Sequence, residues 1–141
     1  MRTIKFKGKS LMNGQWVSGD LAHSLDGKLN ILGFVEEEGK IGFTGAHQID
    51  PTTVCQFTGF YAEDRVPIYE NDIVECTYFD HNGDDTHVRG IVVWEDWGYF
   101  LKPIGDDKKK YEQIGYEFLD LPIDTESEIK VIRNKFDNSY D

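Results

Sequence analysis

Apolar and polar residues alternate with a period of two along much of this chain, and this pattern constrains its fold more than any other feature. Residues 4–7 show it first, because two apolar side chains alternate with two lysines and would occupy opposite faces of a strand. Asn13-Gly14 and Asp26-Gly27 interrupt the alternation, and such dipeptides readily adopt the positive φ angles of tight hairpin turns. The sequence therefore predicts a succession of short antiparallel strands.

The second half of the chain shows the same pattern. Residues 73–79, 88–94 and 99–102 are predicted to form a three-stranded meander, and residues 129–136 a closing strand. Helical signals are short, since Asp50-Pro51 is typical of the start of a single helical turn. Residues 111–121 fit either a short helix or an irregular strand. The predicted fold is mainly β, a small barrel-like or β-meander domain with short helical turns and no helix longer than about three turns.

The length of 141 residues predicts one domain, residues 1–141. A domain of this size buries roughly two-thirds of the surface that its unfolded chain exposes, so that it needs neither a disulfide nor a metal to fold. Aromatic residues make up 13% of the chain, and their stiff side chains suit strands better than helices.

The formal net charge of −11 makes bare nucleic acid and anionic membranes unfavourable partners. The charge is unevenly placed, because residues 1–19 contain Arg2, Lys5, Lys7 and Lys9 and no acidic residue. Two interpretations of this basic end stay open. It pairs with acidic neighbours inside the fold, or it supports head-to-tail self-association.

The chain has two cysteines, Cys55 and Cys76, and neither belongs to a C-x-x-C motif. Their apolar neighbours predict that both fill the core as reduced thiols, and a single disulfide is the alternative. The N-terminal residues lack the apolar segment of a signal peptide, and no apolar run is long enough to span a membrane. We expect a cytoplasmic protein.

Residues 80–87 combine three aspartates with His81 and His87, which are residue types that bind metals. The segment does not match an EF-hand, because its glycine and its final acidic ligand do not fall at positions six and twelve counted from Asp80. Two imidazoles also lack a third ligand for a transition metal, which would be the alternative. The sequence therefore predicts a solvated hairpin loop and no bound metal.

No motif in the sequence predicts catalysis or a cofactor. Residues 36–39 are predicted to form an exposed turn, and residues 41–43 a short strand. Residues 39–45 are rich in glycine, but their spacing matches neither the dinucleotide-binding nor the P-loop pattern. There is no G-x-S-x-G motif, and neither cysteine has a base close by in the sequence. Adjacent acids such as Asp84-Asp85 point to different sides of a turn, whereas paired-carboxylate catalysis needs a pocket. No catalytic residue and no cofactor is predicted.

Trp94, Trp97 and Tyr99 cluster around one predicted turn. Most aromatic rings of a meander lie in its core, but a tight turn does not bury every ring. We predict that Trp94 belongs to the core, that Trp97 is at least partly exposed, and that Trp97 and Tyr99 contact a partner.

Five segments, in order along the chain, resemble the YopX family of small proteins from phages and prophages of Gram-positive bacteria. They are residues 2–9 (RTIKFKGK), 13–19 (NGQWVSG), 50–59 (DPTTVCQFTG), 68–74 (IYENDIV) and 131–138 (VIRNKFDN). Pro67 and Asn71 stand where the family commonly has glycine, and asparagine keeps the turn possible because it tolerates positive φ. The resemblance implies a compact β-rich fold, a phage or prophage origin and the bacterial cytoplasm. It implies no activity.

We expect a non-enzymatic accessory protein of a phage or prophage that binds a protein. The partner would be a host protein or a second copy of the chain, bound through an acidic surface or through self-association. The alternative is a small-ligand-binding protein or enzyme, with a pocket at the barrel mouth lined by Tyr, Trp and His side chains of the central meander.

Overall fold

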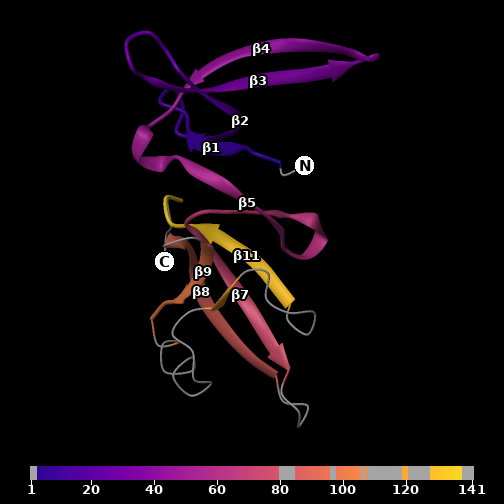
Figure 1. The fold of residues 1–141 in the computed structure, drawn as a ribbon, viewed down its shortest axis with the longest axis vertical. Coiled ribbons are helices and arrows are strands. Elements are labelled where there is room, and N and C mark those ends of the chain that lie inside the picture. Colours follow the sequence, from indigo (N-terminus) through magenta and orange to yellow (C-terminus); the bar gives the residue numbers. More distant parts are fainter. Residues whose placement is uncertain are drawn as a thin grey trace. The chain divides into compact units, whose positions relative to one another are not determined.

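The computed structural model describes residues 3–79, 85–95, 98–105, 107, 119–120 and 128–137 (Figure 1). These residues fold mainly into antiparallel strands, which confirms the predicted fold class. The elements are β1 (Phe6–Lys9), β2 (Trp16–His23), β3 (Leu29–Glu37), β4 (Lys40–Gln48), the 3-10 turn η1 (Pro51–Thr53), β5 (Cys55–Tyr61), the 3-10 turn η2 (Glu63–Arg65), β6 (Pro67–Tyr69), β7 (Asp72–Phe79), β8 (Asp85–Glu95), β9 (Gly98–Pro103), β10 (Leu119–Asp120) and β11 (Glu128–Asn134).

The contacts divide the chain into two compact units, residues 1–57 and residues 58–141, and each is described by itself. The single domain predicted from the length stays a prediction. Within the described residues neither sheet closes into a barrel, so that a meander describes the fold better than a barrel. No helix in the described part of the chain is long and apolar enough to cross a membrane.

In unit 1 the strand order is β4-β3-β2-β1-β5. Both predicted hairpin turns are confirmed, because Gly14 follows β1 with φ 70° and Gly27 follows β2 with φ 82°. The first loop is longer than a two-residue turn. Its closing hydrogen bond runs from the Ser10 N–H to the Gln15 carbonyl at 2.9 Å, which leaves four residues in between.

The second turn is held by the Asp26 carboxylate. It accepts hydrogen bonds from the Ser24 hydroxyl and, at 3.2 Å, from the Lys28 N–H. These bonds, the Ser24 bond first, hold the pKa of Asp26 below its usual value. The folded state therefore gains stability from this group above the ordinary pKa of an aspartate, and loses it as the pH falls through the lowered value.

The strand β4 extends to Gln48, well beyond the short strand predicted at residues 41–43. The chain turns between β3 and β4 at Glu38 and Gly39, whose φ angles of 51° and 75° are the positive pair of a type I′ turn. The added residues include glycine and alanine, which have weak strand preferences. Pairing with β3 as far as Asn30 holds them in the sheet, and no local signal predicts that pairing.

The largest buried apolar side chains of unit 1 are Ile31, Ile49 and Phe57, each at most 2% exposed. Cys55 is buried among the same strands as a free thiol, as predicted. A β-carbon on Gly8 would lie 2.5 Å from Cδ1 of Ile49, so this contact requires glycine. The helical turn predicted to start at Asp50-Pro51 is also confirmed.

The turn η1 begins at Asp50, whose carboxylate accepts a hydrogen bond from the Thr52 N–H at 3.0 Å. The hydroxyl of Thr53 accepts a hydrogen bond from the Lys9 N–H at 2.9 Å. The turn is therefore fastened to the end of β1.

In unit 2 the larger sheet has the order β10-β9-β8-β7-β11. The predicted meander is confirmed as β7, β8 and β9, and the predicted closing strand is β11, which pairs with β7. The second half of β5 lies in this unit beside β6. Leu119 and Asp120 form β10, and the rest of the segment at 111–118 and at 121 lies outside the described residues.

The core of unit 2 is built from alternate residues of these strands. Its buried members are Ile68, Val74, Cys76, Val88, Val92, Tyr99 and Leu101. Cys76 is a free thiol, as predicted. A β-carbon on Gly90 would lie 2.7 Å from Cγ of Leu101 and 3.0 Å from the carbonyl oxygen of Lys102, so that β8 and β9 approach closely there.

A buried pair of polar side chains joins β7 to the end of β11. Asp72 is 1% exposed and Asn134 is 3% exposed. The Asp72 carboxylate accepts a hydrogen bond from the Tyr69 N–H at 2.8 Å and another from Nδ2 of Asn134 at 2.9 Å. The turn before β7 has Asn71 at φ 67°, the conformation expected for an asparagine that replaces glycine.

Candidate functional site

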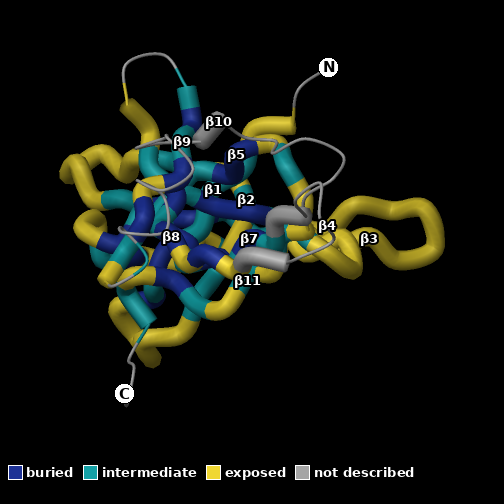
Figure 2. Tube along the Cα trace, turned by 90° about the horizontal axis from the view of Figure 1, so that it is seen from below, coloured by how far each residue is buried: buried dark blue, intermediate teal, exposed yellow. Residues whose placement is uncertain are grey.

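The outer end of the β3–β4 hairpin, residues 34–43, is the most exposed regular structure that the model describes, and we call it the arm. Figure 1 shows β3 and β4 as a long two-stranded ribbon, and Figure 2 shows its tip exposed. Every residue of the arm is exposed. The cross-strand pairs are Phe34–Phe43, Val35–Gly42, Glu36–Ile41 and Glu37–Lys40.

One face of the arm is mainly apolar, with Glu36, the cross-strand partner of Ile41, as its charged residue. Phe34, Ile41 and Phe43 belong to neighbouring cross-strand pairs of the same parity and share this face. Their exposed fractions are 53%, 76% and 60%. The two phenylalanine rings pack at a centroid distance of 5.5 Å with an interplanar angle of 55°. An apolar patch of this kind on a soluble protein marks a surface for interaction.

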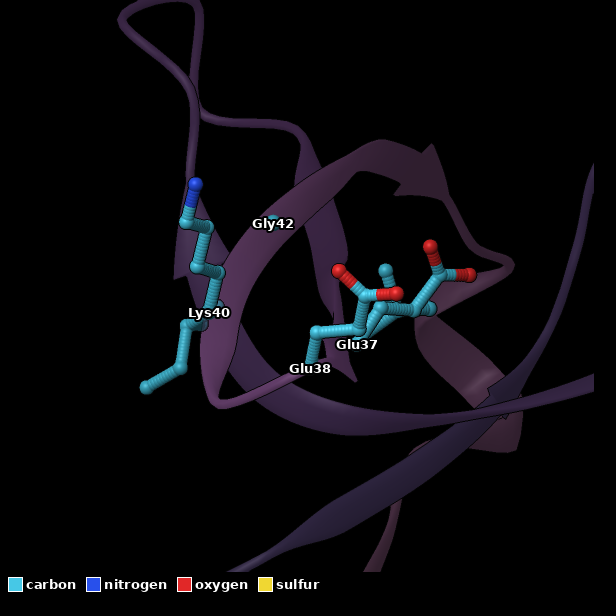
Figure 3. A pocket seen from close by; sticks show the side chains of 6 residues that line it. Glu37, Glu38, Lys40 and Gly42 are labelled. Atoms are coloured by element: carbon cyan, nitrogen blue, oxygen red, sulfur yellow. The ribbon is translucent and has the colours of Figure 1, made fainter.

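The tip of the arm is acidic. Glu36, Glu37 and Glu38 lie next to each other in the sequence, and Lys40 is the only basic residue of the arm. An open hollow of 660 Å³ lies here, and Figure 3 shows Lys40 across it from the two labelled carboxylates. It is lined by Val35, Glu37, Glu38, Lys40, Ile41 and Gly42. None of these is a Tyr, Trp or His, the residues expected to line a pocket at a barrel mouth.

Sequence reasoning treated residues 36–43 as a turn with a short strand and did not identify the arm as a surface. A signal was present, because three consecutive glutamates interrupt an apolar alternation between Phe34 and Phe43. In a strand that packs against a second layer, such a run would place a carboxylate on the buried face. The run therefore indicates that neither face of this segment is covered.

The charge of the chain is divided between the two units. Residues 1–57 contain six basic and six acidic residues, so that the formal net charge of −11 lies within residues 58–141. Unit 1 is neutral overall, with Lys5, Lys7 and Lys9 on β1 or next to it and its three glutamates at the arm tip.

The lysines of the basic N-terminal strand lie over aromatic rings of unit 1. Nζ of Lys7 and of Lys9 are 4.5 Å and 5.5 Å from the ring centroid of Trp16. Nζ of Lys5 is 5.5 Å from the ring centroid of Phe57. The basic N-terminal end therefore makes cation–π contacts, in addition to the two interpretations that the sequence left open, pairing with acidic neighbours and head-to-tail self-association.

The prediction that Trp94 belongs to the core is wrong, because this side chain is 48% exposed. Its parity is the same as that of the buried Val92, but it lies beyond the end of the core. Tyr99, its cross-strand partner, is 8% exposed and covers the core, and the Trp94 ring packs edge-on against it at 4.7 Å. The burial of Tyr99 does not favour the contact role predicted for it. Trp97 lies outside the described residues.

Trp94→Ala should lower the free energy of unfolding by about 1–2 kcal/mol, because only about half of this ring is removed from water and its pairing with Tyr99 is lost. A fully buried large aromatic would be worth about 3–5 kcal/mol. Chemical denaturation of the variant, followed by circular dichroism, measures the difference. A loss in the upper range would mean that the ring is covered in solution.

Of the two candidate imidazole ligands, His87 lies within the described residues. His81 lies outside the described residues. Nδ1 of His87 is 3.0 Å from the Thr77 hydroxyl and 3.9 Å from a carboxylate oxygen of Glu75. Among the described residues no group of three His, Cys, Asp or Glu side chains could hold a metal ion. The absence of metal stays a prediction.

A family model described as YopX protein matches residues 5–140, nearly the whole chain. No curated protein matches the chain. The family match agrees with the resemblance that the five sequence segments carry, and it assigns no biochemical role.

Proposed function

The chain belongs to the YopX family, and from that premise we propose that it is a protein-binding module whose binding element is the arm. The exposure of Phe34, Ile41 and Phe43 on one face of the arm carries the proposal. Burying a fully exposed side chain of this size on a partner releases about 1.5–3 kcal/mol before the cost of association, and these three, which are already partly covered, each release part of that amount. The module acts in the bacterial cytoplasm as an accessory protein of a phage or prophage.

The chemistry around the apolar face describes the partner. Three glutamates surround the tip of the arm against one lysine. A partner with an apolar patch and basic residues at its rim would be attracted, whereas an anionic membrane would be repelled. Basic rim residues would accelerate association, and the apolar contact would set the lifetime of the complex.

The arm is a better contact surface than the tip of the meander. The arm exposes three large apolar side chains on one face, whereas at the meander tip Tyr99 is buried and Trp94 rests on it. The alternative of a small-ligand site has the hollow of 660 Å³ in its favour, a volume typical of ligand pockets. Its charged, open lining lacks the apolar walls of such pockets, so that protein binding is the better proposal.

The variant Phe34→Ser/Phe43→Ser tests the proposal, because it removes the apolar face without touching a buried residue. A tagged wild-type protein should retain a discrete protein from an extract of a Gram-positive host, and the variant should retain at least tenfold less. The free energy of unfolding should fall by about 1–3 kcal/mol, because about half of each ring is removed from water and the pairing of the two rings is lost. Retention by the wild type should also fall as salt is raised, because the glutamates contribute to it.

The matched control is Leu11→Ser/Met12→Ser, which removes two exposed apolar side chains, 57% and 93% exposed, from a different loop. It should retain as much of the partner as the wild type. If the arm variant and the wild type retain the same proteins in the same amounts, the arm is not the binding element.

A further inference from the structure

The two sheets end in four strands, and one of these edges lacks the protection that the others have. β6 has three residues and begins with Pro67, and β10 has two residues. β11 carries Lys130 and Arg133 and a register shift. β4 has nine residues, a register shift next to Phe43 and a single lysine, Lys40, at its first position, so that residues 41–43 carry no charge, proline or bulge. Short length, proline, charge and bulges are the means by which proteins prevent an edge from pairing with another chain.

The inner end of β4 is covered, and its outer end is open. The Leu11 N–H donates to the Gln48 carbonyl at 3.0 Å. A register shift between the pairs Gly33–Gly45 and Phe34–Phe43 separates this inner end from the outer segment, residues 40–43. Within the described residues no strand pairs with the outer side of β4.

The turn geometry decides which main-chain groups face outward. A two-residue type I′ turn at Glu38-Gly39 makes Glu37–Lys40 a hydrogen-bonded pair, and such pairs alternate with non-hydrogen-bonded ones. The N–H and carbonyl groups of Ile41 and Phe43 therefore point away from β3. The side chains of the same two residues form part of the apolar face.

We propose that a second copy of the chain occupies this edge, so that the two β4 strands pair antiparallel about a two-fold axis at Gly42. This register is the one that uses both outward residues of both copies, because Ile41 of each copy pairs with Phe43 of the other. Gly42 then faces its own counterpart in a non-hydrogen-bonded pair, with the Cα atoms about 4.5 Å apart. The edge is thus complementary to itself.

The charges fit this arrangement. In an antiparallel pair the two acidic tips point to opposite ends, so that the six glutamates do not meet. The edge belongs to unit 1, which has no net charge. The two apolar faces would join into one surface, with Phe34, Ile41 and Phe43 from each copy. The inference rests on the proposed function, because this joined surface is the one that would receive the partner.

Gly42→Cys tests the register directly. A β-carbon at residue 42 meets only Cγ2 of Val35 at 3.5 Å and the carbonyl oxygen of the same residue at 3.9 Å, both ordinary contacts. A Cα separation of about 4.5 Å lies in the range that a disulfide bridges. Under mild oxidation most of this variant should become a covalent dimer. The wild type should not, because Cys55 and Cys76 are fully buried.

Lys40→Cys is the matched control. In the proposed register the two copies of residue 40 are offset by four residues, about 13 Å along the strands, which a disulfide cannot span. It should give at least tenfold less covalent dimer than Gly42→Cys. Equal yields from both variants would overturn the register.

A second measurement does not depend on oxidation. Sedimentation equilibrium of the wild type should show the mean mass rising from one chain towards two with concentration, and Ile41→Pro should abolish the rise. Proline at this position removes an outward N–H and an exposed side chain but no hydrogen bond to β3, so the melting temperature of the monomer should change little. A wild-type mass of one chain at every concentration, with no covalent dimer from Gly42→Cys, would overturn the proposal.

The two proposals fail separately. Loss of partner retention in Phe34→Ser/Phe43→Ser without a Gly42→Cys dimer removes the second copy and leaves the binding module. A Gly42→Cys dimer with unchanged partner retention in the arm variant removes the binding module and leaves the pairing of two copies, because the pairing uses the main chain.

Discussion

We expect Asp72→Ala to lower the free energy of unfolding by about 3 kcal/mol or more. The carboxylate is 1% exposed, and it is the acceptor for the Tyr69 N–H and for Nδ2 of Asn134. Removing it deletes both hydrogen bonds from a buried site, and each hydrogen bond to a charged acceptor is worth about 1.5–3 kcal/mol. Amide hydrogen exchange at Val74 and Val92, both buried in unit 2, would measure the loss where it arises.

Two further variants separate the hydrogen bonds from the charge. Asp72→Asn keeps one acceptor oxygen but turns an amide donor towards one of the two donors, so its effect should lie between those of the wild type and of Asp72→Ala. Asp20→Ala removes an exposed carboxylate from β2 and should change stability by less than about 0.5 kcal/mol. An effect of Asp72→Ala as small as that of Asp20→Ala would contradict the buried arrangement.

The close approach of β8 and β9 should appear as a coupling between two substitutions. Leu101→Ala should lower the free energy of unfolding by about 2–5 kcal/mol, because this side chain is fully buried and leaves a cavity. Gly90→Ala should lower it by about 1–3 kcal/mol, because its β-carbon would lie 2.7 Å from Cγ of Leu101.

The double variant should be more stable than the sum of the two losses predicts, because the added methyl group occupies part of the space that Leu101 leaves. Compensation should be partial, since the carbonyl oxygen of Lys102 stays 3.0 Å from the new β-carbon. Denaturation of the wild type, both single variants and the double variant gives the coupling energy. Strict additivity would show that the two residues do not meet.

The β-strands and turns followed from local properties of the chain. A period of two in side-chain polarity places alternate residues on opposite faces whatever the rest of the chain does, and it predicted the strands of the meander. The positive φ of Gly14 and Gly27 and the N-terminal position of Asp50 in its turn depend on only a few neighbouring atoms. The sequence was sufficient to predict these strands and turns because neighbouring residues determine them.

The candidate site could not be found in this way. Phe34 and Phe43 flank a run of three glutamates that argues against a covered face, but the exposure of both rings is seen only in the described structure. Trp94 has the parity of the core and lies beyond its end. Burial depends on which elements pack against a face, and alternation does not specify them.

By itself the sequence determined the mainly-β class, the positions of most turns, the two buried thiols and the membership of the YopX family. Only the tertiary structure decided which strand ends each sheet, how far β4 extends and that Asp72 meets Asn134, 62 residues away. The physical reason is the range of the interactions. Backbone preference and side-chain period act over a few residues, whereas sheet order, burial and long-range hydrogen bonds depend on which distant segments the folded chain brings together.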